Sequence, residues 1–326
     1  DYKFVKDLEN ENLMLDIIIA QRDVIDIDVS RLLVEKCYLY GIKLIYEIDD
    51  DLVNIDTTQP DFKRYEEKIN VVRYLAENAT CITVTTDSLK ASLSGFNTNI
   101  EILPNVLTDS WKLDENFEIG DGETIKIGYM GTTTHANDLK LIEEAIKNIQ
   151  ASSDKNIVFE MVGGTDGSFE GMYRVNVPFD KRHYPDFVEW LQDAIKWDIA
   201  IAPLVENNHI NQGKSELKYL EYTALNVPGI YSDVGPYAKC ISHGDNGLLV
   251  KNNSVEEWEI NMKKLIESKE LREKLLKNSK EDIFKNYVLE NLETNWEVTL
   301  NKFKRDKNSL LYQKIDEYCN NDEDIR

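Results

Sequence analysis

Cysteine and basic residues are scarce in this sequence, and long apolar runs are absent. The four cysteines, Cys37, Cys81, Cys240 and Cys319, lie far apart and form no Cys-x-x-Cys pair. The sequence therefore indicates neither a disulfide framework nor a zinc knuckle, and it favours the reducing cytoplasm. No apolar stretch approaches the roughly 18 residues that a membrane span requires, so we expect no span.

The shortage of basic residues excludes one large class of function. The chain has 38 Lys and Arg against 60 Asp and Glu, a net charge of −22. Proteins that bind nucleic acids need clustered cations to neutralise phosphates, so we expect no nucleic-acid partner. The same charge disfavours binding to an anionic membrane surface. Any phosphate-bearing ligand must be held by a local group of cations against the field of the whole chain.

Short apolar runs alternate with segments of helical periodicity along both halves of the chain. The predicted strands cover 16–20, 42–48, 81–85, 100–103, 125–130, 157–162, 198–202, 229–232 and 247–250. The predicted helices cover 28–40, 61–78, 87–93, 138–149, 184–195 and 215–225, and 255–317 is almost entirely helical. This alternation predicts an α/β protein with parallel sheets covered by helices, built as two Rossmann-like domains that face each other across a central cleft.

An acidic, aperiodic stretch separates the two halves and indicates a linker. We therefore predict an N-terminal Rossmann-like domain over 1–107, a linker over 108–123, a second Rossmann-like domain over 124–300 and a helical tail over 301–326. At 326 residues, the length fits two domains.

The most informative segment follows the strand predicted at 198–202. A helix is expected to begin near Ser215, a residue type that caps helices well. Lys214, Lys218 and Glu221 are spaced i, i+4 and i+7, which places them on one face of that helix. Two ammonium groups at a helix N-terminus suit a diphosphate, and a carboxylate one turn later suits sugar hydroxyls. The alternative is a solvated helix with ordinary Glu/Lys pairing, and the spacing alone leaves it open.

Three aspartates, Asp49 to Asp51, end the strand predicted at 42–48 and are expected at the cleft. Oxygen ligands of this kind suit Mg²⁺ or Mn²⁺. A phosphoacceptor aspartate is another reading, but no companion lysine follows a later strand. The aspartates could instead cap the following helix.

Several other polar and aromatic residues allow two readings. Gly163-Gly164 follows a predicted strand and could line a nucleotide pocket or simply form a turn. The isolated His183, His209 and His243 have no metal-ligand spacing, so cap or surface roles are expected. The aromatic residues expected in the core or in domain packing are Trp190, Trp197, Trp258 and Trp296.

The stretch from Lys214 to Tyr222, Lys-Ser-x-x-Lys-Tyr-x-Glu-Tyr, resembles the donor-binding segment of retaining GT-B glycosyltransferases of glycosyltransferase family 4. The likeness continues through 226–228, 232–237 and 243–250, and upstream through 127–135 and the Pro-Asn-Val of 104–106. It covers most of residues 40 to 300. We predict about four strands in the N-terminal domain, whereas a full N-terminal domain of this family has more. We therefore expect this domain to be incomplete and the chain to be cropped from a longer polypeptide.

The resemblance assigns roles position by position. It implies donor-phosphate contacts by Lys214 and Lys218, a ribose contact by Glu221, and a sugar or acceptor contact by Asp49 or Asp50. The residues expected to bind the donor are Gly131, Thr132, His135, Lys214, Ser215, Lys218 and Glu221, and those expected to act in catalysis are Asp49, Asp50, Lys214 and Lys218.

The sequence also departs from the family pattern. Gly213 stands where the family has a glutamate, and Thr132 and Asn137 stand where it has Arg and Lys. These departures place more of the phosphate contact on Lys214 and Lys218. Glu206 is a candidate to replace the missing glutamate.

The resemblance implies a cytoplasmic, metal-independent glycosyltransferase in bacterial surface glycan or glycoconjugate assembly. It would transfer a sugar with retention of configuration from a nucleotide-diphosphate sugar to a glycan, lipid-linked or protein acceptor, without a cofactor. Its oligomeric state stays open. The alternative is a degenerate glycosyltransferase-like subunit that stabilises a partner enzyme. A dinucleotide-dependent oxidoreductase is the weakest reading, because the stretch from Gly128 to Gly131 does not match G-x-G-x-x-G.

Overall fold

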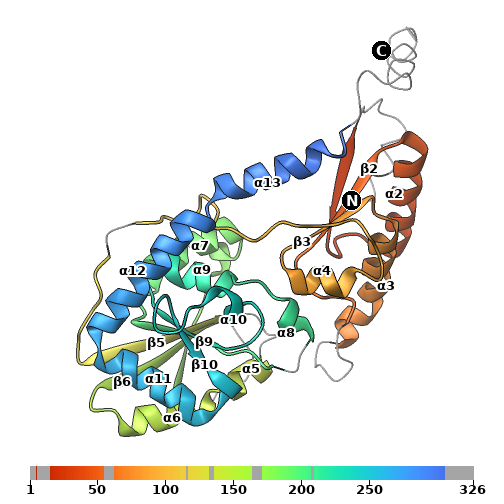
Figure 1. Ribbon diagram of the computed structural model, residues 1–326. Helices are drawn as coiled ribbons and strands as arrows, with labels where there is room; N and C mark the ends of the chain where they lie inside the picture. The colour runs from red at the N-terminus through yellow and green to blue at the C-terminus, as the bar shows by residue number, and fades with distance from the viewer. Residues whose placement is uncertain are drawn as a thin grey trace. The chain divides into compact units, whose positions relative to one another are not determined.

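The computed structural model of this protein describes residues 5, 15–54, 62–114, 117–131, 136–163, 171–206 and 209–304. The chain divides into two compact units, Asp1–Pro104 with Glu293–Arg326, and Asn105–Leu292 (Figure 1). Each unit contains one parallel β-sheet, as the alternation of strands and helices predicts. Among the described residues, no helix is both long enough and apolar enough to cross a membrane.

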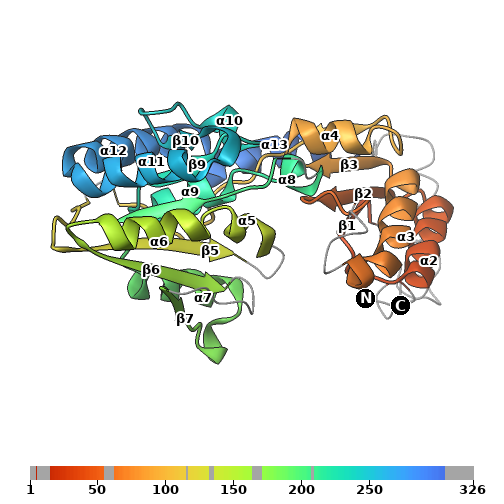
Figure 2. The same ribbon diagram turned by 90° about the horizontal axis from the view of Figure 1, so that it is seen from below.

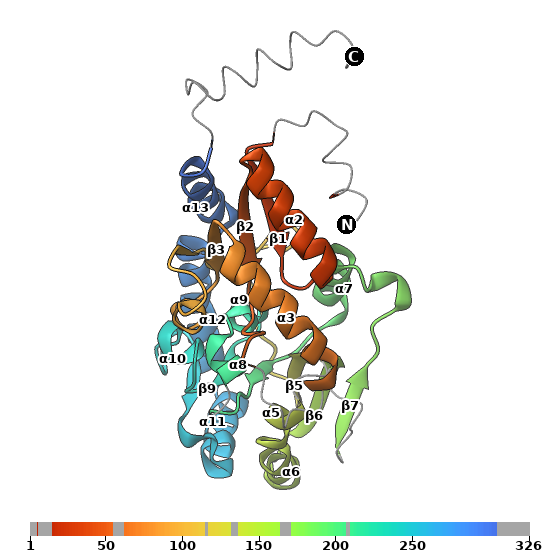
Figure 3. The ribbon, with the colours of Figure 1, turned by 90° about the vertical axis from the view of Figure 1, so that its right-hand side faces the viewer.

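The first unit contains a sheet with strands in the order β1-β2-β3-β4. Its strands are β1 (Ile17–Gln21), β2 (Lys43–Ile48), β3 (Cys81–Val84) and β4 (Ile100–Ile102). Its helices are α2 (Ile27–Tyr40), α3 (Phe62–Asn78) and α4 (Asp87–Leu93), and α13 (Leu289–Asn301) lies mostly in this unit. Helices α2 and α3 lie side by side (Figures 2 and 3).

Local sequence signals account for these helix ends. The Asp26 side chain accepts a hydrogen bond from the Val29 N–H and caps α2, and Gly41 ends it in the left-handed region at φ 64°. The Thr86 side chain caps α4 in the same way. Central strand β2 is almost completely buried, so the following loop starts from a rigid support.

The second unit contains a six-stranded sheet in the order β10-β9-β8-β5-β6-β7. Its strands are β5 (Thr124–Gly131), β6 (Asn156–Gly163), β7 (Met172–Val175), β8 (Ile199–Ala202), β9 (Gly229–Ser232) and β10 (Leu248–Val250). Its helices are α5 (Ala136–Lys140), α6 (Glu143–Ser152), α7 (Tyr184–Ala194), α8 (His209–Gly213), α9 (Leu217–Ala224), α10 (Tyr237–Cys240), α11 (Val255–Glu267) and α12 (Lys269–Asn286), with short 3-10 turns η2 (Phe179–Lys181) and η3 (Lys251–Asn253).

Two apolar cores pack against the opposite faces of this sheet. One contains side chains of α6 and α11, and the other contains side chains of α7 and α9. Figure 1 shows α6 and α11 below the strands and α7 and α9 above them. Trp258 and Trp197 are buried in these cores, as predicted. This three-layer arrangement leaves the carboxyl ends of the strands as one edge at which polar loops meet.

The structure corrects three local predictions in this unit. The helix predicted over 138–149 is two helices. Between them, the Leu141 and Ile142 N–H groups donate hydrogen bonds to the carbonyls three residues earlier, of Asp138 and Leu139, as in a 3-10 turn. Strand β7 and helix α8 were not predicted: β7 is an edge strand with no fully buried residue, and α8 is only 5 residues long.

Candidate functional site

The predicted donor segment does not begin as the sequence suggests. Helix α9 starts at Leu217 with Glu216 at the N-cap position and no side-chain cap. Ser215 is therefore not the cap, and its hydroxyl accepts a hydrogen bond of 2.7 Å from the Asn105 side-chain amide. Lys214 precedes the helix, so the predicted common helical face exists only for Lys218 and Glu221, which lie one turn apart on α9. The prediction that all three share one helical face was wrong, because residues 214–216 lie between the short helix α8 and α9.

Tyr222 attaches α9 to the carboxyl ends of two strands. The ladder between β5 and β8 ends at the pair Gly128 and Ala200. Beyond it, the buried Tyr222 hydroxyl accepts a bond of 3.2 Å from the Met130 N–H and donates one of 3.1 Å to the Ile201 carbonyl. The phenol thus takes the place of the missing strand pairing, and it fixes the helix that carries Lys218 and Glu221 against the end of β5.

Lys218 and Gly131 meet at the ring of Tyr129. The Lys218 ammonium lies 5.7 Å from the centre of that ring, within the range of cation–π attraction. A Cβ at Gly131 would come 2.4 Å from the Tyr129 hydroxyl oxygen, so a larger residue would require Tyr129 to shift. Two residues predicted to contact a pyrophosphate therefore share one neighbour. Thr132 and His135, predicted for the same site, lie outside the described residues.

Glu221 belongs to a chain of hydrogen bonds that sequence reasoning missed. The Trp111 indole N–H donates to the Tyr184 hydroxyl at 3.3 Å, and this hydroxyl donates to Glu221 Oε1 at 3.4 Å. Burial raises the pKa of Glu221 to about 7, although the Lys218 charge and the Tyr184 hydrogen bond oppose the rise. Tyr184 is the first residue of α7, so this chain links α9 with α7.

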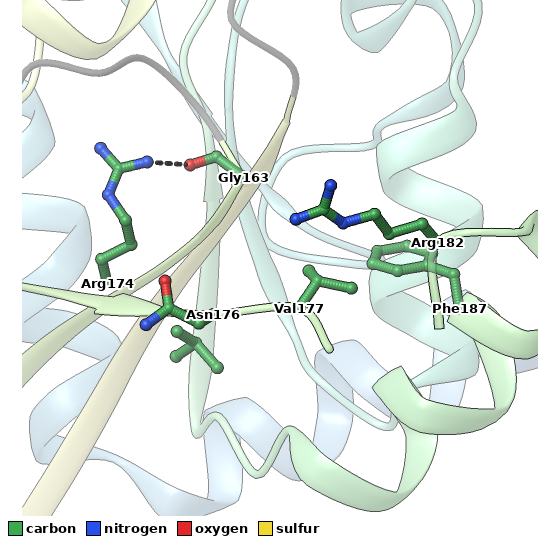
Figure 4. Close-up of a pocket in the computed structure, with 7 residues that line it drawn as sticks. Gly163, Arg174, Asn176, Val177, Arg182 and Phe187 are labelled. Atoms are coloured by element: carbon green, nitrogen blue, oxygen red, sulfur yellow. Dashed lines mark hydrogen bonds between the residues drawn. The ribbon is translucent and has the colours of Figure 1, made fainter. Parts of the chain in front are cut away.

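A pocket of about 520 Å³ opens at the carboxyl ends of β6 and β7 (Figure 4). Its lining residues are Gly163, Arg174, Val175, Asn176, Val177, Arg182 and Phe187. Gly163 has φ +72°, and a Cβ there would come 2.3 Å from the Gly131 carbonyl oxygen, so the ends of β5 and β6 approach as closely as glycine permits. Gly163, one of the two glycines suggested either to line a nucleotide pocket or to form a turn, lines this pocket, and Gly164 lies outside the described residues.

In the first unit, Arg22 joins two of the three predicted aspartates. Its guanidinium lies 2.7 Å from Asp49 Oδ1 and 3.1 Å from Asp50 Oδ2. Burial, followed by the Asp50 charge, raises the pKa of Asp49, while Arg22 opposes that rise. The Arg22 guanidinium therefore holds the Asp49 and Asp50 carboxyls together at the carboxyl end of β2.

Arg22 itself adopts an unusual backbone conformation for a residue other than glycine. Its φ is 47°, and hydrogen bonds of 2.9 Å fix it on both sides: its N–H donates to the Glu47 carbonyl, and its carbonyl accepts from the Tyr46 hydroxyl. Such backbone strain often accompanies functional sites. One signal in the sequence points to Arg22: it directly follows β1, which pairs in parallel with β2, so the ends of both strands meet at one edge.

Asp51 differs from its two neighbours. It is buried and accepts hydrogen bonds from the Val53 and Asn54 N–H groups and from the Ser92 hydroxyl. It thus stabilises a turn, and no described helix follows it directly. In the described part of the chain, no three acidic, histidine or cysteine side chains are grouped to hold a metal ion.

The remaining candidates have ordinary surroundings. The His243 Nδ1 accepts a bond of 2.9 Å from the Leu249 N–H, and His183 occupies the N-cap position of α7. The side chain of His209 lies outside the described residues. Glu206 is exposed, and Gly213, which stands in place of the family glutamate, is buried at the end of α8.

Comparison with known proteins adds to this geometry. A family model described as "Glycosyl transferases group 1" matches residues 124–268, which lie within the second unit and include β5, α9 and the pocket. No protein with curated information matches this sequence significantly.

Several solved structures resemble the whole chain. TarM from Staphylococcus aureus, a mutant in complex with fondaparinux, alpha-GlcNAc-glycerol and UDP, aligns with TM-score 0.65 and 13% identity over 93% of this chain and 58% of that chain. HepE from Anabaena in complex with UDP-glucose aligns with TM-score 0.65 and 11% identity over 92% of this chain and 81% of that chain. Sucrose-phosphate synthase from Thermosynechococcus elongatus aligns with TM-score 0.67 and 14% identity over 92% of this chain and 77% of that chain. At such identity these likenesses establish the fold, which is GT-B. This chain thus spans little more than half the length of TarM.

Proposed function

We propose that this chain, a GT-B protein whose second unit matches the group 1 glycosyl transferases, transfers a sugar from a nucleotide-diphosphate sugar to an acceptor hydroxyl. One observation carries the proposal. Tyr222 fixes α9 to the ends of β5 and β8 and so brings the Lys218 ammonium over Tyr129, next to the glycine that ends β5. A lysine ammonium group beside the end of a strand is placed to contact a phosphate.

The donor is proposed to lie along the carboxyl ends of β5 and β6. Lys214 and Lys218 contact its diphosphate, the Gly131 backbone approaches the same group, and Glu221 accepts hydrogen bonds from the ribose hydroxyls. The half-buried Glu221 suits this role, because its raised pKa reflects a carboxylate that lacks solvation and gains from new donors. Thr132, His135 and Ser215 complete the set that the family resemblance suggests.

The chemistry follows from the charge that develops as the sugar leaves. The departing diphosphate becomes more negative in the transition state, so the two lysines stabilise it more strongly there than in the ground state. The family resemblance supports retention of configuration, with attack from the face of the leaving group and removal of the acceptor proton by the leaving phosphate. Asp49 and Asp50, paired with Arg22, are proposed to orient the sugar or the acceptor hydroxyl.

The wider role is proposed on the same basis. WaaG, described as a glycosyltransferase involved in lipopolysaccharide biosynthesis, aligns with TM-score 0.60 over 83% of this chain. This likeness supports a role in the assembly of bacterial surface glycans, on a glycan, lipid-linked or protein acceptor. We place this reaction in the cytoplasm, without a metal or other cofactor.

The test has a binding step and a catalytic step. A panel of nucleotide-diphosphate sugars is screened by thermal shift, because a ligand that binds only the folded state raises the melting temperature. The best donor is then used to measure transfer by wild type, Lys218→Ala and Lys277→Ala. Lys277 is an exposed lysine of α12 that lies 4.0 Å from Glu281 and serves as the control.

We expect Lys218→Ala to reduce turnover by more than about tenfold, about 1.4 kcal/mol of barrier, with an unchanged fold. Lys277→Ala should match wild type. Equal turnover of all three proteins would refute the phosphate site. Failure of every donor to bind would refute the function and favour the partner-binding subunit described above.

A further inference from the structure

The pocket beside Gly163 contains two arginines that differ in their surroundings (Figure 4). Arg174, on β7, donates a hydrogen bond of 2.9 Å to the Gly163 carbonyl and so holds the end of β6. Arg182 precedes α7, and its guanidinium lies 5.2 Å from the centre of the Phe179 ring. In Figure 4 this guanidinium points toward the Gly163 end of the pocket. Arg174 is thus a structural residue, whereas Arg182 is directed at the space itself.

Arg182 is exposed, and no carboxylate in the part of the chain that the structure describes lies within ion-pair distance of its guanidinium. The adjacent Lys181, by contrast, pairs with Glu189 at 3.5 Å. The absence is notable in a chain of net charge −22. A guanidinium is always charged and presents five N–H donors in a planar fork. A ligand with acceptor atoms in one plane would satisfy it.

The position of the pocket suggests which part of a ligand reaches it. Tyr184 follows Arg182 by two residues and donates a hydrogen bond to Glu221, the residue proposed to bind ribose. Strands β5, β6 and β7 are neighbours, so the end of β7 lies about 10 Å from that of β5, two strand spacings away. A nucleotide with its phosphates at Gly131 and its ribose at Glu221 therefore directs its base toward the pocket.

We propose that this pocket selects guanine as the base of the donor, through a two-pronged hydrogen bond from the Arg182 guanidinium to O6 and N7. This inference rests on the proposed function and specifies its substrate class. Guanine carries two adjacent acceptors on one edge, which match the fork of an arginine. Val177 and Phe187 provide apolar contact for the faces of the ring.

The other bases fit this guanidinium less well. Adenine has an amino group, a donor, beside its N7 acceptor. Uracil offers the O4 carbonyl next to a ring N–H, so only one acceptor faces the fork. Cytosine has adjacent N3 and O2 acceptors, but its O2 adjoins the glycosidic bond and is shielded by the ribose. The expected order of affinity is therefore guanine first, cytosine second, uracil third and adenine last.

Calorimetric titration of the full chain with GDP, UDP, ADP and CDP tests the order, and titration with pyrophosphate provides a probe without a base. The variants are Arg182→Ala, Arg182→Lys and the control Lys181→Ala. We expect wild type to bind GDP about tenfold more tightly than ADP, the scale of one good two-pronged contact. Arg182→Ala should abolish this preference with ADP and pyrophosphate affinities unchanged, Arg182→Lys should restore little of it, and Lys181→Ala should retain it.

The possible results separate this inference from the function on which it rests. Equal affinity of wild type for all four diphosphates, or a preference for UDP or CDP, would overturn guanine selection and leave the glycosyltransferase proposal intact. If Arg182→Ala weakens pyrophosphate as much as GDP, Arg182 contacts a phosphate and the inference is again overturned. If no diphosphate binds wild type, the proposed function fails, and guanine selection fails with it.

Discussion

The proposed contact between Glu221 and the ribose makes donor binding dependent on pH. Burial raises the pKa of this carboxyl to about 7, with Lys218 and Tyr184 opposing the rise. If only the ionised carboxylate accepts hydrogen bonds from the two ribose hydroxyls, the affinity for the donor follows the ionised fraction of Glu221. For a pKa of about 7, that fraction is roughly 0.9 at pH 8 and roughly 0.1 at pH 6. The Kd for the donor should therefore be about tenfold higher at pH 6 than at pH 8.

The stability of the free protein should move in the opposite direction. The pKa of the Glu221 carboxyl is about 7 in the folded chain, and we take the ordinary glutamate value of 4.5 for the unfolded chain. Between these values the folded state holds a proton that the unfolded state has lost, so stability falls as pH rises from about 4.5 to about 7. The full shift corresponds to an upper bound of about 3 kcal/mol. Glu221→Gln removes this loss, and the variant should be more stable than wild type at pH 8 but not at pH 4.

The assay is calorimetric titration with a nucleotide-diphosphate sugar at pH 6, 7 and 8, since its phosphates do not titrate in this range. Wild type should show the change in Kd, and Glu221→Gln should be flat and weaker at pH 8. Tyr184→Phe removes a hydrogen bond that favours the charged form, so its transition should move to higher pH. A wild-type Kd that does not change across this range, or the same pH dependence in Glu221→Gln, would refute the assignment of Glu221 to the ribose.

Three further substitutions test the surrounding site. Lys214→Ala should reduce transfer by more than about tenfold in steady-state assays, and unchanged turnover would remove Lys214 from the phosphate contacts. Tyr222→Phe should lower the free energy of unfolding by about 2 kcal/mol, because it breaks two buried hydrogen bonds; urea denaturation measures this, with the exposed Tyr38→Phe as a neutral control. Arg22→Gln removes the cation that opposes the raised pKa of Asp49, so the acidic limb of the pH profile of kcat/KM should shift upward, and an identical limb would show that Asp49 does not act as a carboxylate in the reaction.

Periodicity and cap residues predicted most of the fold because those signals are local. The ends of α2 and α4 depend on side chains within three residues of the helix, and those residues lie where the sequence places them. The split of the helix predicted over 138–149 has a tertiary cause. Asp138 is buried and accepts hydrogen bonds from the Val205 N–H at 2.8 Å and from the Asn211 side chain at 3.0 Å. No pattern in the neighbouring residues reveals that this carboxylate binds a loop some 67 residues away.

The candidate site shows the same division between local and tertiary signals. A motif of consecutive residues identified Lys218 and Glu221 because both lie on one helix. Tyr184 lies at the start of α7 and Arg182 just before this helix, and the hydrogen bond from Tyr184 to Glu221 joins residues 37 positions apart. Only the order of the strands in the sheet brings such residues to one edge, and that order is not written in any single segment.

The charge of the chain explains why this edge requires such support. A net charge of −22 opposes the approach of an anionic donor, so affinity must come from short-range contacts that solvent and salt screen weakly. Here the cations are held by aromatic rings: Lys218 lies over Tyr129, and Arg182 over Phe179. Contacts of this kind orient a cation. For Lys218 the ring of Tyr129 adds to the nearby carboxyl of Glu221, whose pKa the lysine charge lowers, so both neighbours help to position this ammonium group.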